Sequence, residues 1–527
     1  MISTTDPSVD APFESTEASE VPFKSAEEFD AATAIAPGGA VPLKSRPGIT
    51  LYVQSIISNF LQNALPPLNT YIFTVYLHGS ALNVAQLNSL NTIAWSLRVI
   101  FGMLSDYAQL FGYRRKVWLI VGWLLALGGV ASIAFSSFGS PFCDPKEYPT
   151  CLNPKVNTTI KAYDLSASSR VAWYRTPTFF TTLGAVMVQA NLDGIVVEYA
   201  HREPIGIRGR IQAFTFFISG IGILLSRFFL LFCMSAKRYG GTYDWSAGPN
   251  VPYIIAFALV LVGLFLAIVL FQDTLNHIKS FKEWVEKLWL LLQNRAVYQL
   301  LAFRFSTNLL QSLTGTSVLT WVRNLDLQWA NVIPRIPYVP TMIITMRLGT
   351  NWNWRKSILI FTSLSILVTS IATFCVIWDA CRNCYFYIIL IASTAIATAL
   401  NTLMPAWAMV EVAGIGHEAT IAAIYNTIKD LNVPITTKWR NYIIESFPSI
   451  PLLLNDRHNQ NQVGYTWLIS LGVQIVGLAF IFLIPTQRIP ILNMKENSGQ
   501  SILAGCIVIA GYIALFVFDW QQSLQNY

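Results

Sequence analysis

Long apolar runs, separated by short polar turns, repeat along this chain from residue 50 onwards. A helix needs about 20 residues to cross the hydrocarbon core of a bilayer, and these runs are long enough. The pattern predicts six spans, an interruption, six further spans and one last run. The expected helices cover 50–77, 83–106, 116–139, 171–199, 209–235, 251–272, 296–322, 330–348, 356–379, 385–411, 417–446, 463–485 and 501–518.

This order predicts an all-α polytopic membrane protein made of two six-helix halves, residues 47–272 and 296–485. Between them, residues 273–295 form an amphipathic segment in which Trp284 and Leu288 share a face opposite Lys282. We expect this linker to lie along the cytoplasmic surface. In the C-terminal segment, 486–527, the run 501–518 is either a thirteenth span or a surface helix.

Residues 1–46 differ from the rest because they are rich in Ser, Ala, Pro and acidic residues and contain few aromatic residues. Such a composition buries too little apolar surface to offset the entropy lost on ordering, so we expect a disordered tail. It has neither the basic and apolar regions of a signal peptide nor the composition of a transit peptide.

Composition supports a membrane environment. Of 527 residues, 54% are hydrophobic and only 12% are charged, whereas soluble domains have about 25% charged residues. The net charge is +7, but the basic residues lie at the ends of apolar runs. That distribution sets membrane topology, so the lipid bilayer is a partner and nucleic acid is not expected to be one.

The basic residues also predict the orientation. They gather in the turns on the side of the N-terminus, which should therefore be cytoplasmic. The opposite segment 140–170 contains Cys143, Cys151 and a glycosylation sequon at Asn157. We expect a disulfide between these two cysteines, as befits an exoplasmic side. The plasma membrane is the first expectation for location, with an organelle membrane as the alternative.

One group of residues joins the second and third expected spans. It consists of Trp95, Ser96, Leu97, Arg98, Gly102, Met103, Leu104, Ser105, Asp106, Gly112, Tyr113, Arg114, Arg115 and Lys116. An acid at the end of one helix, near a basic pair, can form breakable contacts that hold one state of a carrier. Gly102 would let two helices approach closely. We therefore predict gating roles for Gly102, Asp106, Arg114 and Arg115. The simpler alternative is that the basic residues only fix topology.

A second group surrounds the end of the fourth expected span. Asp193 lies within an apolar helix, where a carboxylate is costly and is therefore a functional candidate. Glu198 and Arg202 are four residues apart, the spacing of an ion pair on one helical face, and we include them in the predicted gate. Alternatively, Glu198 and Arg202 belong to a solvated helix end.

Together the two groups resemble the folate–biopterin transporter family of the major facilitator superfamily. The resemblance rests on Trp-Ser-x-(basic)-x3-Gly-x2-Ser-Asp, on Gly112 six residues after Asp106, and on Asp-Gly-x-Val-Val-Glu from Asp193. It covers residues 90–215. The chain departs from the family pattern in having Ala94 before the tryptophan, where Pro is usual, and Arg98 in place of Lys.

The resemblance implies a major facilitator bundle that carries folate, biopterin or a related small organic anion, with protons as the expected co-transported ion. From the residues themselves, Arg98, Arg304 and Lys429 are intramembrane cations suited to an anionic solute. Asp193 and Asp430 are candidate protonatable partners. Asn63 is a candidate hydrogen-bond donor to a pterin ring, although such amides equally join helices to each other.

No phosphate-binding loop, hydrolase elbow or metalloprotease motif is present in the sequence. We therefore expect no enzyme activity, no cofactor and no metal, and we expect a monomer. Two alternatives remain open. One is a major facilitator carrier of a sugar, amino acid or drug; the other is a receptor-like membrane protein without transport, for which deletion of 1–46 should abolish function.

Overall fold

The computed structural model describes residues 34–143, 164–241, 243–273, 280–323, 327–449 and 456–524. These residues form helices and loops, joined by only a few isolated backbone bridges. Three of the sequence predictions lie wholly or mainly outside the described residues: Cys151, Asn157 and most of the acidic tail. The last part of that tail, residues 34–45, lies against the end of the helix that contains His201, whose carbonyl accepts a hydrogen bond from the Ala36 N–H at 3.0 Å.

The first half is a bundle whose helices follow the expected spans closely. They are α2 (Arg46–Thr70, continued by the π-helical Tyr71–Tyr76), α3 (Ala81–Ser96), α4 (Arg98–Tyr107), α5 (Lys116–Ala134), α6 (Ala167–Arg170), α7 (Arg175–His201), α8 (Arg210–Met234) and α9 (Val251–Phe265, continued by the π-helical Leu266–Leu270). Helices α2 and α8 pack together, as do α5 and α7.

A short amphipathic helix, α10 (Phe281–Gln293), connects the halves, as the pattern predicts. The second half comprises α11 (Arg295–Gln311), α12 (Leu327–Val332), α13 (Tyr338–Leu348), α14 (Trp354–Ile377), α15 (Cys384–Val412), α16 (Glu418–Ser446) and α17 (Arg457–Ala479). After it come α18 (Arg488–Asn497) and α19 (Ile502–Leu524).

Two predicted helix boundaries are wrong. The run 83–106 is not one helix, because α3 and α4 are separated at Leu97, next to Arg98. The run 296–322 is α-helical only to Gln311 and becomes helical again only as a 3₁₀ turn at Leu319–Trp321. After Gln311 the backbone leaves the helix and is bound by side chains of α17. The Trp467 indole donates to the carbonyl of Thr316 at 2.8 Å, and the Gln474 amide donates to that of Leu313 at 2.7 Å. These bonds satisfy backbone groups that a helix would otherwise satisfy internally.

Among the described residues, eight helices are long and apolar enough to cross a membrane by length and composition. They include α19, which favours a spanning helix over a surface helix for the last run. The spans that fall short of this criterion carry polar residues within the bundle. Gln62 lies on α2, Arg98 on α4, Arg304 on α11 and Lys429 on α16. Helices α4 and α11 fall short by length, at 10 and 17 residues, whereas α2 and α16 are long enough and fall short by their polar composition.

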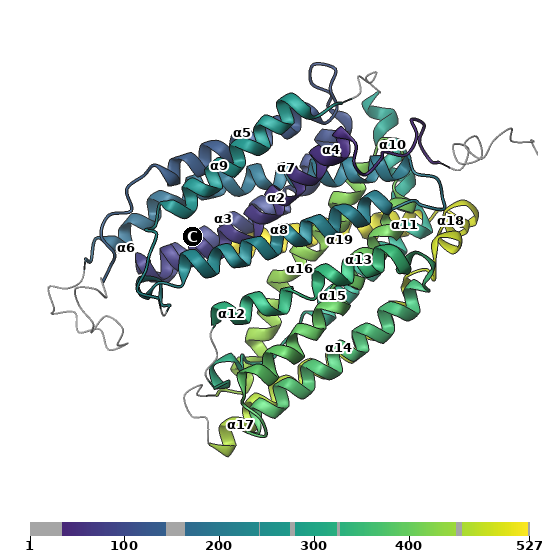
Figure 1. Cartoon of the computed structure of the whole chain (residues 1–527). Coiled ribbons are helices and arrows are strands. Elements are labelled where there is room, and N and C mark those ends of the chain that lie inside the picture. Colours follow the sequence, from purple (N-terminus) through teal and green to yellow (C-terminus); the bar gives the residue numbers. More distant parts are fainter. Residues whose placement is uncertain are drawn as a thin grey trace, which may run out of the picture.

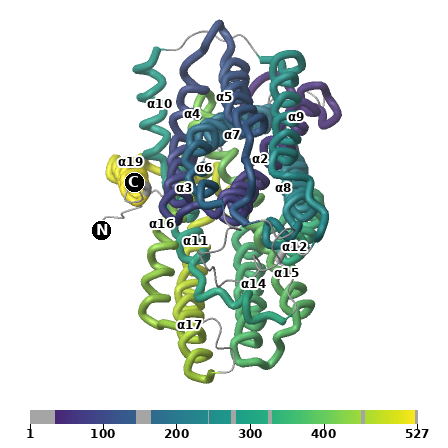
Figure 2. Tube along the Cα trace, turned by 90° about the vertical axis from the view of Figure 1, so that its left-hand side faces the viewer, coloured from purple at the N-terminus to yellow at the C-terminus, as the bar shows by residue number. Residues whose placement is uncertain are grey.

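The two halves are close together at one end of the molecule and diverge towards the other (Figure 1). We call the end with the α4–α5 turn, α10 and α18 the closed end, and the end with α6 and the start of α17 the far end. Helix α16 contacts α4 and α7 across the junction, and α8 contacts α12 and α13. Helix α19 lies at the edge of the molecule, beside α3 and α16 (Figure 2).

Candidate functional site

A cavity of about 380 Å³ lies between the two halves and is lined by residues of both. All six residues predicted to bind solute or couple its transport line this cavity: Asn63, Arg98, Asp193, Arg304, Lys429 and Asp430. They come from α2, α4, α7, α11 and α16. Residues far apart in the sequence therefore meet at one central site.

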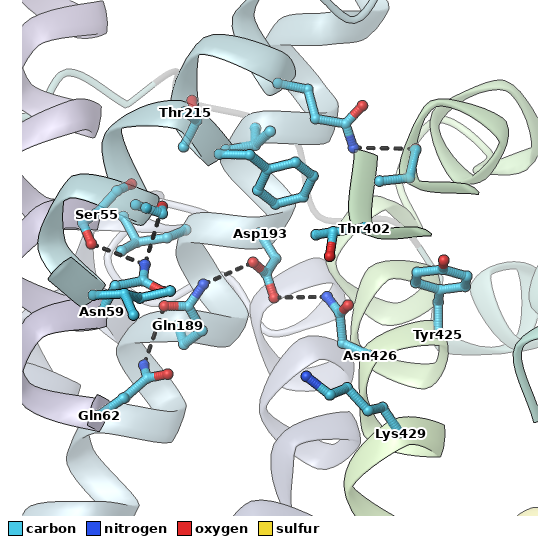
Figure 3. A pocket seen from close by; sticks show the side chains of 18 of the residues that line it. Ser55, Asn59, Gln62, Gln189, Asp193, Thr215, Thr402, Tyr425, Asn426 and Lys429 are labelled. Atoms are coloured by element: carbon cyan, nitrogen blue, oxygen red, sulfur yellow. Dashed lines mark hydrogen bonds between the residues drawn. The ribbon is translucent and has the colours of Figure 1, made fainter. Parts of the chain in front are cut away.

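Asp193 lies in a network that joins three helices. Arg98 donates to one carboxylate oxygen of Asp193, and the same oxygen accepts from the Asn426 amide of the other half at 3.1 Å. The second oxygen accepts from Gln189 at 2.9 Å (Figure 3). The second guanidinium nitrogen of Arg98 lies 3.7 Å from Asp430 on α16. Arg98 thus connects a carboxylate of each half, a geometry that the planar fork of arginine permits.

The other cations of the cavity have no acidic partner among the described residues. Arg304 lies over the ring of Tyr425, with its Cζ 4.8 Å from the ring centroid, and its Nε is buried without a hydrogen-bond partner. Lys429 and Arg335 are exposed to the cavity, and no acid of the described segments lies within ion-pair distance of either. The lining therefore holds four cations against the two acids Asp193 and Asp430, an excess of two positive charges.

The polar residues of α2 serve mainly to join helices. Asn59 donates to the hydroxyl of Ser219 on α8 at 3.1 Å, and Gln62 donates to Gln189 on α7 at 3.1 Å. Asn63 donates to the carbonyl of Asn59 in its own helix, at 2.9 Å. Its amide oxygen accepts no hydrogen bond within the described part of the chain. The amide oxygens of Asn59 and Gln62 likewise accept no hydrogen bond among the described residues, so all three residues bring a free acceptor to the cavity lining.

At the closed end, the six residues of the predicted gate lie together. Asp106 accepts from Arg114 and from Arg115, each at 2.9 Å. Glu198 lies 3.3 Å from the Nε of Arg115 and accepts from Arg202 at 2.7 Å, the pair that their spacing predicts. Arg115 is only 1% exposed, and Asp106 and Arg114 are also buried, so these three charges are held by one another, whereas Glu198 and Arg202 are half-buried. We call this set the α4–α5 network.

The α4–α5 network continues into the second half. Glu418, the first residue of α16, accepts from Arg114 and lies 3.4 Å from Arg115. Asp106 also accepts from the backbone N–H and the hydroxyl of Thr420, at 2.7 and 2.8 Å. Gly102 is required here, because a Cβ at this position would lie 2.7 Å from the carbonyl oxygen of Ala419. The two halves are therefore in contact through backbone atoms as well as through ion pairs.

A second network, centred on Glu411 at the end of α15, closes the other side of the junction. Arg208, in the turn between α7 and α8, donates to Glu411 at 2.7 Å, and Arg488 of α18 lies 3.6 Å from it. Lys495 donates to the Glu411 carbonyl at 2.8 Å. Trp407 donates to the carbonyl of Gly209 at 3.2 Å. We call this set the α15 network.

The sequence analysis missed the acceptors of the second half, Glu411 and Glu418. Each lies at an end of an apolar run, as Asp106 does. This position at a helix end is the feature of the sequence that could have identified them as gate residues. It also missed Arg335, which lies in an exposed 3₁₀ turn and enters the cavity lining only because the chain breaks between α12 and α13.

The cysteines divide as follows. Cys143 is disulfide-bonded, while its predicted partner Cys151 lies outside the described residues. Cys381 and Cys384, which form a C-x-x-C sequence, are free thiols. Within the described residues there is no group of histidines, cysteines and acids arranged to hold a metal ion.

Comparison with known proteins agrees with this arrangement. The sequence model of the BT1 family matches residues 62–140. The folate–biopterin transporter of Synechocystis is 25% identical over 182 residues, which cover 34% of this chain and 28% of that protein. The match thus spans less than a third of the relative's length.

Solved structures share the fold. The proton:xylose symporter XylE, bound to 6-bromo-6-deoxy-D-glucose, matches with a TM-score of 0.57 at 12% identity, covering 86% of this chain and 98% of that chain. The transporter FucP in its outward conformation matches with a TM-score of 0.50 at 11% identity, covering 82% of this chain and 96% of that chain. A structure of the E. coli fucose:proton symporter FucP matches with the same values. The match to the BT1 family model and to the Synechocystis protein confirms the predicted resemblance to the folate–biopterin transporter family, and the solved structures confirm a multi-pass bundle with the major facilitator fold.

Proposed function

We propose that this protein is a secondary transporter of folate, biopterin or a related small organic anion, working by alternating access and coupled to protons. The observation that carries the proposal is the charge of the central cavity. Arg304, Arg335 and Lys429 face it without an acidic partner among the described residues. Unpaired cations in a cavity within the membrane are costly unless an anion or water compensates them. An anionic solute supplies that compensation.

The Arg98 bridge supports a coupling role for Asp193. A proton on Asp193 removes the charge that holds Arg98, while the amides of Gln189 and Asn426 remain as its neighbours. Arg98 is then released towards Asp430 and the cavity. Binding of an anionic solute and protonation of Asp193 thus favour the same rearrangement, which is what coupling by linkage requires.

The two networks at the closed end support alternating access. They join the halves by ion pairs that break when the halves rock apart, while the far end diverges (Figure 1). We propose that the closed end is cytoplasmic, since Arg114, Arg115, Arg202, Arg208 and Arg488 gather there. The disulfide at Cys143 supports an exoplasmic far end. The plasma membrane is the proposed location.

Uptake measurements test the proposal. The chain is expressed in cells unable to take up folates, and uptake of labelled folate, biopterin and a neutral sugar is followed across a pH series. We expect folate or biopterin uptake that rises with external acidity. Uptake of the sugar alone would identify a carrier of another class, and no uptake of any solute would favour a receptor-like protein.

Neutralising single acids sharpens the test. Asp193→Asn should abolish the dependence of uptake on external pH. Asp519→Asn is the matched control, because Asp519 is also a buried acid in an apolar helix but does not line the cavity. Equal pH dependence in wild type and Asp193→Asn would remove Asp193 from the coupling mechanism.

A further inference from the structure

A second hollow lies outside the central cavity, on the outer side of the second half. It is an apolar groove of about 970 Å³ between α11, α16 and α19. Its walls include Phe305, Ile428, Trp439, Val508 and Leu515. None of the groove residues lines the central cavity. Helix α16 separates the two spaces, because Ile424 and Ile428 face the groove whereas Asn426, Lys429 and Asp430 line the cavity.

The length of the groove matches a lipid chain. It extends along α19 from Ala504 to Phe518. At 1.5 Å per residue this stretch is about 21 Å long. The hydrocarbon core of a bilayer is about 30 Å thick, so one leaflet accounts for about half of that. The groove is therefore long enough to take a whole acyl chain lying parallel to α19.

A basic residue lies at one end of the groove. Lys438 is twenty positions after Glu418 on the same helix, a rise of about 30 Å, which places it at the membrane interface opposite the α4–α5 network. Its ammonium nitrogen lies 5.5 Å from the ring centroid of Phe518, and no acid forms an ion pair with it among the described residues. Trp439 and Tyr442 beside it are 44% and 72% exposed. Such aromatic residues are typical of the headgroup level.

We propose that this groove binds an anionic phospholipid, with an acyl chain along α19 and the headgroup phosphate at Lys438. Charge complementarity selects this occupant. A neutral or zwitterionic lipid would fill the same apolar walls but would leave the ammonium without a net opposite charge. Because the groove shares α16 with the central cavity, the lipid packs against the helix that carries Lys429 and Asp430.

Native mass spectrometry of the full chain in detergent tests the proposal, with phosphatidylglycerol or phosphatidylcholine of identical chains added in turn. We expect retention of phosphatidylglycerol over phosphatidylcholine. Lys438→Gln should lower phosphatidylglycerol retention about fivefold, the effect of one basic residue at a membrane surface, and leave phosphatidylcholine unchanged.

A second variant fills the groove without touching the charge. A Cβ at Gly511, which lines the groove, has no atom within 4 Å, so Gly511→Leu adds a side chain into open space. It should lower retention of both lipids. Gly472→Leu on α17 is the matched control, since that glycine is equally open but lies outside the groove, and it should change neither.

Three results would overturn the proposal: equal retention of the two lipids by wild type, unchanged phosphatidylglycerol retention in Lys438→Gln, or a dimer that Gly511→Leu dissociates. The last would identify a second copy of the chain as the occupant. None of these outcomes depends on uptake of any solute, so the lipid site and the transport function are tested separately.

Discussion

Asp106 of α4 caps α16, a helix of the other half, by accepting hydrogen bonds from both the backbone N–H and the hydroxyl of Thr420. The same carboxylate accepts from Arg114 and Arg115. A side chain of one half therefore satisfies a helix N-terminus of the other, where the helix dipole favours a negative charge. Contacts of this kind are lost whenever the halves separate at the closed end.

Replacing Asp106 should shift the conformational equilibrium. Asp106→Asn keeps the shape but removes the charge that balances two buried guanidinium groups, a loss of about 3 kcal/mol from the closed state. We expect a larger population in which this end is open, measured as distances between spin labels on the two halves. Asp456→Asn is the control, because Asp456 also caps a helix, α17, but only within its own half. Identical distance distributions in Asp106→Asn and wild type would contradict the prediction.

The close approach at Gly102 gives a steric prediction. In Gly102→Ala the new Cβ would lie 2.7 Å from the Ala419 carbonyl oxygen and 2.9 Å from the Ala423 Cβ, so α4 and α16 must move apart. The closed state should be weakened by about 1–3 kcal/mol, the usual cost of overpacking. Gly128→Ala on α5, where a Cβ meets no atom within 4 Å, should be neutral or slightly stabilising.

Cysteine accessibility at the closed end reports this effect. A cysteine placed there should react faster with a membrane-impermeant reagent in the Gly102→Ala background than in the Gly128→Ala background. If both backgrounds react at the same rate, the contact between α4 and α16 does not limit opening.

Because Arg98 contacts both Asp193 and Asp430, we predict that transport depends on the forked shape of its guanidinium group as well as on its charge. Arg98→Lys retains a cation but offers a single ammonium, which cannot reach Asp193 and Asp430 together. We expect uptake to fall at least about tenfold. Arg227→Lys is the control, since Arg227 lies in a spanning helix without lining the cavity. Full uptake by Arg98→Lys would show that only the charge at this position is used.

Glu203 predicts a pH dependence of stability. It lies in the turn between α7 and α8, and burial raises its pKa from 4.5 to about 7, against the opposing effects of Arg210 and of the backbone N–H groups that bind it. The folded state therefore holds a proton that the unfolded chain releases above about pH 4.5. The stability from this group is complete below pH 4.5 and is lost as the pH rises through about 7, a change of up to about 3 kcal/mol.

Thermal unfolding in detergent across this pH range measures the effect. Glu203→Gln cannot titrate, so its unfolding temperature should fall less than that of wild type between pH 4.5 and 7.5. Glu496→Gln serves as the control because Glu496 lies outside the turn, on α18. Parallel pH profiles for Glu203→Gln and wild type would contradict the assignment.

The spans and the residues that line the central cavity could be predicted from the sequence because both depend on local signals. A long apolar run indicates a membrane-spanning helix. A charged residue inside such a run, as at Asp193 or Arg304, indicates a side chain that does not face lipid. The pairing of the charges could not be predicted from the sequence, because Glu418 and Arg114 are brought together only by the packing of the two halves. The end of α11 at Gln311 was missed although five of the seven residues 312–318 are Ser, Thr or Gly, a local signal against a continuous helix. The bonds from Trp467 and Gln474 of α17 that satisfy the backbone of this segment depend on packing and could not be read from the sequence.

Helix α19 begins at the closed end, where the Ser501 N–H donates to the Gln293 carbonyl, and it runs 23 residues towards the far end. In the proposed topology α19 is a thirteenth crossing, which puts residue 524 on the face opposite residue 34, beside the end of α7. In that topology, reporters attached at residues 34 and 524 sample different compartments. A pH-sensitive fluorophore at each would read both sides of the same membrane during one uptake experiment.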